Sequence, residues 1–204
     1  MRKLIVVNIM SLDGYYEAPG QNVMPLFNFR EAYPEDDTFD VYNASRLRAA
    51  DTLLLGRASY EGFKSYWPDI ADDPDEPPIQ REISRLDNAI EKVVISDSLT
   101  PDQTAPWQDT TRIIRRAEAE DQIAALKQQP GRDILMFGSR TLWNALLARD
   151  LVDELHLVIA PVVLGEGTPL FDGPPPVTPR LIEARARSCS GIVVVTYDVR
   201  RPKA

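Results

Sequence analysis

A strand-to-helix pattern occurs twice in this chain, as Leu53-Leu54-Leu55-Gly56-Arg57-Ala58-Ser59-Tyr60-Glu61 and as Leu135-Met136-Phe137-Gly138-Ser139-Arg140-Thr141-Leu142. Each copy starts with a short apolar run typical of a buried strand and places Gly where the strand ends. Each continues with small hydroxyl residues and an Arg at the start of a helical pattern. The free N–H groups and the positive end of such a helix can bind an anion. From these residues alone, anion binding and a pair of well-capped helices without a ligand are both open.

Apolar runs and helical patterns alternate along the rest of the chain. The runs predict strands over Leu4 to Ile9, Thr52 to Leu55, Lys92 to Ser96, Thr111 to Ile114, Ile134 to Phe137 and Glu154 to Ala160, and a closing hairpin of Arg180 to Ser188 and Gly191 to Arg200. The helical patterns cover Thr38 to Ala50, Ile79 to Ile90, Glu118 to Gln129 and Arg140 to Arg149, and Pro68 to Pro78 is predicted to be a solvated loop. We therefore expect one α/β domain over residues 1–204, with three layers, a central mostly parallel mixed sheet and a C-terminal antiparallel hairpin.

Composition narrows the class of protein. The chain has 31 acidic and 23 basic residues, a net charge of −8, which argues against a nucleic acid partner. The single cysteine, Cys189, excludes an intrachain disulfide and is expected to be an unreactive thiol. No stretch approaches the roughly 20 apolar residues that cross a bilayer, so we expect a cytoplasmic protein. Gly165-Glu166-Gly167 lacks a following helix, and a Walker-type loop is absent, so neither familiar nucleotide-binding fold is indicated.

The order of the motifs resembles that of the dihydrofolate reductase superfamily. The resemblance spans nearly the whole chain, and it rests on Ser11-Leu12-Asp13-Gly14, Leu54 to Glu61, Val93 to Ser96, Phe137-Gly138-Ser139, Leu151 to Leu155 and Pro161 to Phe171. Within the superfamily, the chain is most similar to the reductase domain of bifunctional riboflavin-biosynthesis enzymes and their stand-alone bacterial relatives. This resemblance implies a dihydrofolate-reductase-like fold, NADPH as cofactor, hydride transfer to a small pyrimidine- or pteridine-like heterocycle, and a homodimer.

The resemblance also implies roles for the first strand-to-helix turn. Gly56, Arg57 and Ser59 match the family's Gly-Arg-x-Thr turn at the cofactor phosphates, with Ser in place of Thr. The planar donor group of Arg57 suits a phosphate and is consistent with NADPH rather than NADH. Ser96 matches the hydroxyl that lies near the adenosine 2′-phosphate.

The second turn matches the family's Gly-Gly turn at the pyrophosphate, through Gly138, Ser139, Arg140 and Thr141. The chain departs from the family there, because Ser139 stands in place of the second Gly. The Gly-Gly bond is often cis in the family, so the local geometry of this chain is left open. Asn8 and Tyr15 fall where main-chain groups would hold the nicotinamide carboxamide.

Reduction of a C=N bond also needs a proton donor, and a carboxylic acid in a water-poor pocket is the usual one. Folate reductases carry this acid on the helix before the Gly-Arg strand, at a spacing that here corresponds to Asp40. A helix-start charge beside Asp36 and Asp37 is the alternative interpretation of Asp40. Riboflavin-type relatives do not share the acid reliably.

Two acidic residues and the only histidine lie close together in the sixth predicted strand. Asp153 and Glu154 are expected to form structural ion pairs rather than to act in catalysis. His156 is expected on a face of the sheet, and no metal site is predicted. Two other functions remain open, a true dihydrofolate reductase and a non-catalytic NADPH-binding module. The first is weakened because Leu26 follows Pro25, where that enzyme has a Pro-Trp pair.

Overall fold

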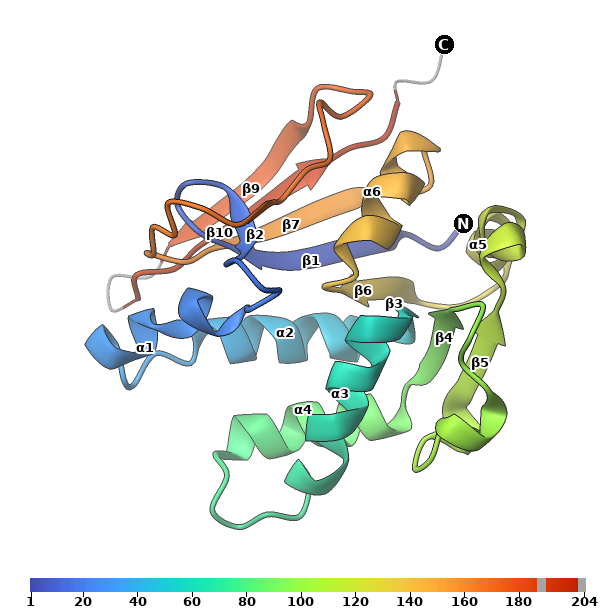
Figure 1. Cartoon of the computed structure of the whole chain (residues 1–204), viewed down its shortest axis with the longest axis horizontal. Helices are drawn as coiled ribbons and strands as arrows, with labels where there is room; N and C mark the ends of the chain where they lie inside the picture. Colours follow the sequence, from blue (N-terminus) through green and yellow to red (C-terminus); the bar gives the residue numbers. More distant parts are fainter. Residues whose placement is uncertain (187–189, 202–204) are drawn as a thin grey trace.

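A computed structural model describes residues 1–186 and 190–201 of the chain. Its centre is an eight-stranded sheet in the order β5-β4-β3-β6-β1-β7-β10-β9 (Figure 1). The six strands from β5 to β7 run parallel, and β10 and β9 close the sheet as an antiparallel hairpin. The strands of this sheet are β1 (Leu4–Met10), β3 (Ala50–Gly56), β4 (Glu91–Ile95), β5 (Thr111–Ile114), β6 (Asp133–Phe137), β7 (Glu154–Ile159), β9 (Arg180–Ala186) and β10 (Val193–Asp198).

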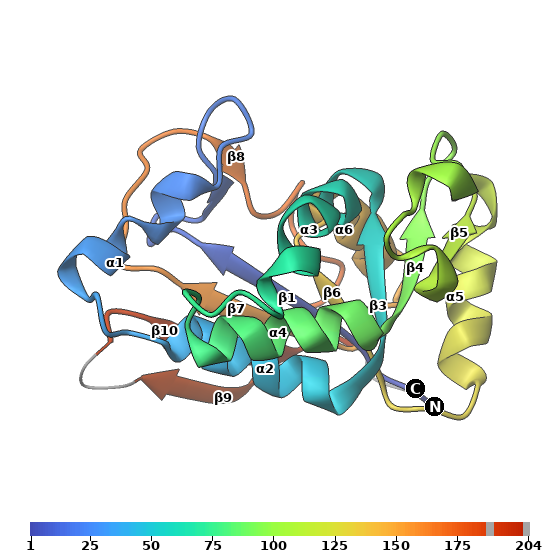
Figure 2. The ribbon, with the colours of Figure 1, turned by 90° about the horizontal axis from the view of Figure 1, so that it is seen from below.

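Helices cover both faces of the sheet, as the alternation of strands and helices predicted. Figure 2 shows α2 and α4 lying across the face that is turned toward the viewer. The helices are α1 (Phe29–Ala32), α2 (Thr38–Ala49), α3 (Arg57–Ile70), α4 (Pro78–Ala89), α5 (Ala119–Gln128) and α6 (Arg140–Ala148), with the 3-10 helices η1 (Met24–Phe27), η2 (Pro101–Gln103), η3 (Gln108–Thr110) and η4 (Arg116–Glu118). Within residues 1–186 and 190–201, no helix combines the length and the apolar character that crossing a bilayer requires.

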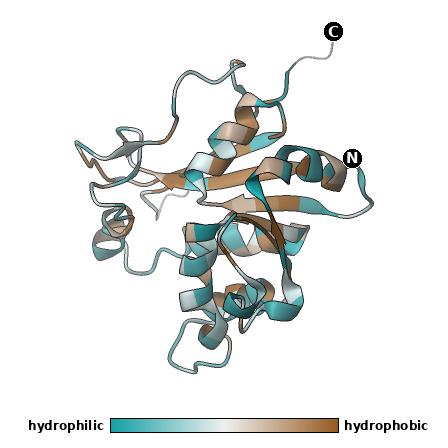
Figure 3. Ribbon diagram, turned by 45° about the vertical axis from the view of Figure 1, so that its right-hand side comes forward, coloured by the Kyte–Doolittle hydropathy of each residue, from teal (hydrophilic) through white to brown (hydrophobic). Residues whose placement is uncertain are grey.

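Two apolar cores lie on the two faces of the sheet. Along β1, Ile5 and Val7 join the core beneath α2, α3 and α4, whereas Leu4 and Val6 join the core beneath α5 and α6. This alternation follows from the two-residue period of a strand. Figure 3 shows the strands of the sheet to be mostly apolar, whereas the helices carry both apolar and hydrophilic residues. The three-layer α/β/α fold predicted from the sequence is therefore confirmed.

The structure corrects some predicted boundaries. Helix α3 continues past Pro68 to Ile70, although Pro68 was predicted to begin a loop. Ser96 and Ala160 lie just outside the strands to which they were assigned. A small second sheet pairs β2 (Tyr15–Glu17) with β8 (Thr168–Pro169) and was not foreseen, because both segments are too short to show a period. The predicted end of the hairpin, residues 187–188, and Cys189 lie outside the described residues.

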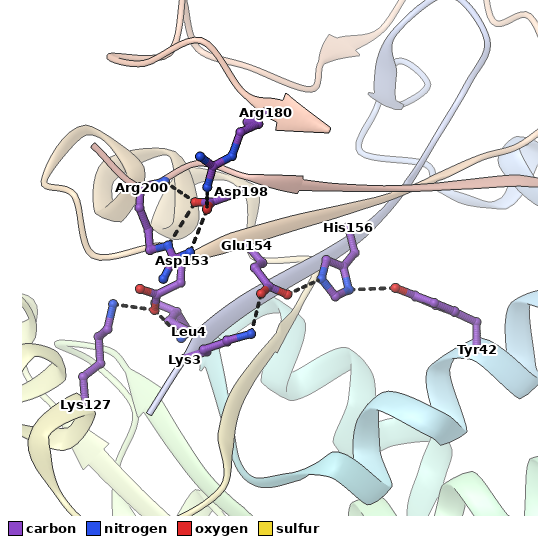
Figure 4. A network of polar contacts seen from close by, with 10 residues as sticks. All are labelled: Lys3, Leu4, Tyr42, Lys127, Asp153, Glu154, His156, Arg180, Asp198 and Arg200. Atoms are coloured by element: carbon purple, nitrogen blue, oxygen red, sulfur yellow. Dashed lines mark hydrogen bonds and ion pairs between the residues drawn. The ribbon is translucent and has the colours of Figure 1, made fainter. Parts of the chain in front are cut away.

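The amino ends of β1 and β7 carry a network of paired charges, in which the carboxylates are buried and some of the cations are exposed (Figure 4). The Asp153 carboxylate lies 2.6 Å from Lys127 Nζ and accepts the Leu4 N–H at 2.7 Å. Glu154 lies 2.7 Å from Lys3 Nζ and 3.0 Å from His156 Nε2. These contacts confirm the predicted ion pairs of Asp153 and Glu154.

The remaining members of the network also form hydrogen bonds and ion pairs within it. The Tyr42 hydroxyl lies 2.7 Å from His156 Nδ1, and Asp198 pairs with Arg180 at 2.5 Å and with Arg200 at 2.7 Å. Hydrogen bonds from His156 and Lys3 hold the pKa of Glu154 near 2. An open cavity of about 740 Å³ lies at this end and is lined partly by Lys127, Asp153, Arg180, Asp198 and Arg200. Because its buried charges already have partners, this cavity is a weaker candidate for a ligand site than the opposite end of the sheet.

Candidate functional site

The two predicted turns meet at the carboxyl end of the sheet. Strands β3 and β6 are parallel neighbours, so Gly56 and Gly138 follow their strands at the same edge. The Ser139 hydroxyl accepts the Gly56 N–H at 3.0 Å, and the Ser139 N–H donates to Ser59 Oγ at 2.9 Å. Two hydrogen bonds therefore hold the starts of α3 and α6 together.

The second turn is shaped by two consecutive left-handed residues. Gly138 has φ 57°, and Ser139 has φ 53° with ψ 40°. A Cβ at Gly138 would lie 3.1 Å from both Ser59 Oγ and the Tyr16 hydroxyl, so a larger residue would crowd both groups. The bond between Gly138 and Ser139 is trans, and Ser139 departs from the family's Gly while keeping a backbone conformation that Gly favours.

The first turn brings a cation to the edge of the site. Arg57 Nε lies 2.8 Å from Glu61 Oε1, and Arg57 Nη1 donates to Ser98 Oγ at 2.5 Å. Ser96 is buried, and its hydroxyl accepts the N–H groups of Ser98 and Leu99 at 3.2 and 3.0 Å. The hydroxyl that contacts Arg57 is thus that of Ser98, which the sequence did not single out.

The predicted residues at the start of α6 differ in orientation. The Arg140 guanidinium lies 2.6 Å from the Asp172 carboxylate, and it also donates to the Pro169 carbonyl. Its side chain is therefore turned toward the segment after β8 rather than toward the turn. Thr141 is exposed in the first turn of α6.

Asn8 and Tyr15 lie on neighbouring segments with different main-chain contacts. The N–H of Tyr15 donates to Ser11 Oγ at 2.9 Å, and its carbonyl accepts the Ser11 N–H at 3.0 Å. Both main-chain groups of Tyr15 are thus already bonded within the chain. Asn8 lies where β1 leaves β6, because the paired register of these strands ends at Val7 and Phe137 while β1 stays paired with β7.

Asp40 is buried, which distinguishes it from a solvated charge at a helix start. It shares one stripe of α2 with Ala44 and Leu47, and its Oδ2 lies 2.9 Å from Arg30 Nη2. Burial raises the pKa of Asp40, while the Arg30 guanidinium and a hydrogen bond from Gln80 oppose this shift. Among the hydrogen bonds of the described residues, none joins Asp40 to either turn.

The Ser-Leu-Asp-Gly motif holds a neighbouring loop in place. The Asp13 carboxylate accepts the N–H groups of Leu164 and Gly165 at 3.1 and 2.7 Å, and the Leu12 N–H donates to the Val162 carbonyl at 2.8 Å. A Cβ at Gly167 would lie 2.1 Å from a main-chain oxygen, so only Gly fits there. These contacts hold the two motifs side by side in the fold.

The comparisons with known proteins agree with this geometry. Residues 2–195 match the family model of the RibD C-terminal domain. The chain is 30% identical to the uncharacterized protein YyaP of Bacillus subtilis (strain 168), over 96% of this chain and 94% of that protein. A solved structure of a proposed riboflavin biosynthesis protein from Shewanella sp. PV-4 is similar, with a TM-score of 0.65 and 22% identity over 98% and 99% of the two chains.

The fold likeness extends to dihydrofolate reductase itself. The enzyme from Enterococcus faecalis, solved in complex with NADP(H) and a compound named RAB-propyl, has a TM-score of 0.58 and 14% identity, over 96% of this chain and 95% of that one. At this identity the likeness shows a shared fold. The chain belongs to the RibD C-terminal domain family, and its fold is that of the dihydrofolate-reductase-like proteins.

Proposed function

We propose that this protein is an NADPH-dependent reductase that transfers a hydride to a small pyrimidine- or pteridine-like heterocycle. The observation that carries the proposal is the joining of the Gly56 and Gly138 turns through Ser139 at adjacent strand ends. Two helix starts side by side offer N–H groups and positive dipole ends to two phosphates of one dinucleotide. A dihydrofolate reductase of the same fold was solved with NADP(H), which supports the same cofactor here.

The residues at the turns fit such a cofactor. A Cβ at Gly138 would crowd Ser59 and Tyr16, so the turn itself requires Gly there, and a Gly at a strand end also lets a pyrophosphate approach the backbone. Arg57 and Ser98 would hold the 2′-phosphate, and Arg115, which donates to the Asp97 carbonyl beside them, adds a second cation. The bound cofactor would supply the hydride, and the chain would supply its alignment.

Asp40 is proposed to donate the proton. A carboxyl group with a raised pKa keeps its proton closer to neutral pH, as a general acid requires. The Arg30 guanidinium works against this by favouring the ionised form. Asp40 could therefore act as an acid only when a bound substrate removes more water or displaces Arg30.

The substrate class follows from the family. The RibD C-terminal domain points to a reductase of riboflavin biosynthesis, so a uracil such as 5-amino-6-(5-phosphoribosylamino)uracil is the first candidate. A dihydrofolate reductase and a non-catalytic NADPH-binding module remain the alternatives. A cytoplasmic location is part of the same proposal.

A homodimer is also part of the proposal. All seven residues of the edge strand β9 are exposed, and Leu181 and Ile182 are 56% and 53% exposed. An exposed edge strand that carries large apolar side chains favours association with another chain, although the charged Arg180, Glu183 and Arg185 of β9 oppose it. Light scattering on the purified protein, compared with a Leu181→Lys variant, would show a change from dimer to monomer.

Titration with NADPH and NADH tests the cofactor assignment. We expect NADPH to bind more tightly, and Arg57→Ala to weaken NADPH about tenfold while leaving NADH nearly unchanged. Arg112→Ala, on β5 and exposed, is the matched control. If Arg57→Ala lowers the affinities for NADPH and NADH equally, a contact between Arg57 and the 2′-phosphate is excluded.

Turnover then separates the three functions. NADPH oxidation at 340 nm is followed with dihydrofolate, pterins and aminouracils. Turnover of aminouracils supports the proposed reductase, and turnover of dihydrofolate supports a true dihydrofolate reductase. Binding of NADPH without turnover supports a non-catalytic NADPH-binding module. Loss of turnover in Asp40→Asn with unchanged NADPH affinity is the result expected of a proton donor.

A further inference from the structure

The cavity at the amino end of β1 lies outside the site built by the two turns. Its volume is about 740 Å³, and none of its described lining residues belongs to the Gly56 turn or the Gly138 turn. A cavity of this size falls in the range that binds small molecules. In the described part of the chain, four cationic side chains and three carboxylates line it.

The buried charges at this cavity are paired, but the pairing leaves one positive charge over. Lys127 and Asp153 form a neutral pair at 2.6 Å, and both side chains are 5% exposed. The Asp198 carboxylate accepts donors from two guanidinium groups, those of Arg180 at 2.5 Å and Arg200 at 2.7 Å (Figure 4). Because the whole chain has a net charge of −8, this local excess is opposite in sign to the charge of the molecule and favours an anion.

Two arginines at the cavity keep donor groups available to a ligand. Arg180 uses only Nη2 in its contact with Asp198, and its side chain is 76% exposed. The Arg201 N–H donates to Asp150 Oδ1 at 3.1 Å, whereas the Arg201 guanidinium has no hydrogen bond or ion pair with another described residue. A guanidinium presents paired N–H groups in one plane, which match the oxygens of a phosphate.

A rigid apolar wall completes the lining of the cavity. Val177 and Thr178 belong to the segment of residues 174–179, in which four of the six residues are prolines. Because the proline ring fixes φ, this segment loses little conformational entropy when a ligand packs against it. Val177 is half-buried and packs against the core beneath α5 and α6. The cavity thus combines a preformed apolar surface with free guanidinium donors.

We propose that this cavity binds a small phosphomonoester with an apolar body. Arg180 and Arg201 would hold the phosphate, and Val177 would contact the apolar body. A dianionic phosphate suits two guanidinium groups better than a monoanionic carboxylate does. Lys127 and Asp153 stay paired, so binding breaks no buried ion pair. The inference does not depend on the proposed function, because the cavity and the two turns share no residue.

The experiment titrates the full chain with four probes at constant ionic strength, because salt screens exposed charges. Phenyl phosphate carries both parts of the proposed ligand, inorganic phosphate lacks the apolar body, benzoate replaces the phosphate by a carboxylate, and benzyl alcohol has no charge. By calorimetry we expect phenyl phosphate to bind several-fold more tightly than inorganic phosphate or benzoate, and benzyl alcohol not to bind. Equal affinities for phenyl phosphate and either of these anions, or no binding of phenyl phosphate at millimolar concentrations, would overturn the inference.

Variants of the lining residues locate the bound phosphate. In the double variant Arg180→Ala/Arg201→Ala we expect phenyl phosphate to bind about tenfold more weakly. Arg201→Ala alone breaks no ion pair, so it should weaken binding by a few-fold and leave the melting temperature unchanged. Arg185→Ala is the matched control, since Arg185 lies exposed on β9, pairs with Glu183 at 2.6 Å and does not line the cavity. An equal loss in the double variant and the control would show attraction by surface charge alone and would overturn the inference.

Arg57→Ala separates the cavity from the turns, which also offer N–H groups to a phosphate. We expect this variant to bind phenyl phosphate as the wild type does. If Arg57→Ala abolishes binding while Arg180→Ala/Arg201→Ala retains it, phenyl phosphate binds at the turns and the inference alone is overturned. If the cavity binds phenyl phosphate and the protein binds neither NADPH nor NADH, the proposed function fails and the inference stands.

Discussion

Replacing Ser139 by Ala and by Gly separates two effects of this residue on stability. Its left-handed backbone, with φ 53°, costs about 1–2 kcal/mol for a residue with a Cβ. Its hydroxyl accepts the Gly56 N–H at 3.0 Å, which contributes about 1 kcal/mol. Ala loses the hydrogen bond and keeps the strain, whereas Gly loses both. The two variants share the first loss, so their difference in stability reports the strain less the extra entropy of Gly in the unfolded chain.

The expected magnitudes follow directly. Ser139→Ala should lower the free energy of unfolding by about 1 kcal/mol. Gly relieves the strain, but its greater conformational entropy in the unfolded chain lowers the free energy of unfolding by about 0.4–1 kcal/mol. Ser139→Gly should therefore be about 0.5–1 kcal/mol more stable than Ser139→Ala.

Urea denaturation of the ligand-free variants measures this difference, provided that the free energy of unfolding falls with urea concentration at the same slope in both variants. Ser59→Ala is the control, because it removes the acceptor of the Ser139 N–H and leaves φ unchanged. A Ser139→Ala protein as stable as Ser139→Gly, or more stable, would show that the strain at this position is no larger than the entropy cost of Gly in the unfolded chain, about 0.4–1 kcal/mol, and would contradict the value expected here.

Two further predictions concern charges away from the turns. Asp153→Ala should lower the free energy of unfolding by about 3–5 kcal/mol, because it leaves the buried Lys127 without its counter-charge. Glu183→Ala, which removes an ion pair on the exposed hairpin, should lower it by less than about 1 kcal/mol. Calorimetry on both variants measures the two losses. Burial raises the pKa of Asp87 to about 8 and lowers that of Lys92 to about 8. The folded state therefore holds a proton on Asp87 that the unfolded state releases near pH 4, and this stabilisation is lost as the pH rises toward 8. Relative to Asp87→Asn, the wild type should lose stability between pH 5 and 8 by up to about 1.4 kcal/mol per unit in urea titrations, and a constant difference would contradict the burial argument.

Much of the fold could be predicted because its elements are short apolar runs and helical patterns. Strands β1, β3 and β6 each contain a run of three or four consecutive apolar residues, as expected of strands covered on both faces. Helix α3 was harder, because Pro68 usually ends a helix and here lies in its last turn. The β2–β8 pair depends on contacts between distant segments, which no local pattern records.

The candidate site could be predicted in part. Gly56 and Gly138 were identified because their turns have a local pattern, and the structure brings them together. The orientation of Arg140 could not be foreseen, since it depends on Asp172, which lies 32 positions away. Ser98 was missed for a similar reason, because its contact with Arg57 exists only once β3 and β4 are paired.

The two ends of β1 impose different demands on the chain. Its amino end lies beside the paired charges around Asp153 and Glu154, and the Gly138 turn lies level with Asn8, roughly 13 Å along the strand from Leu4. Substitutions more than about 10 Å apart usually have additive effects. Substitutions that raise thermal stability at the amino end should therefore leave the turns at the carboxyl end unaffected, and substitutions at those turns should leave the stability of the amino end unaffected.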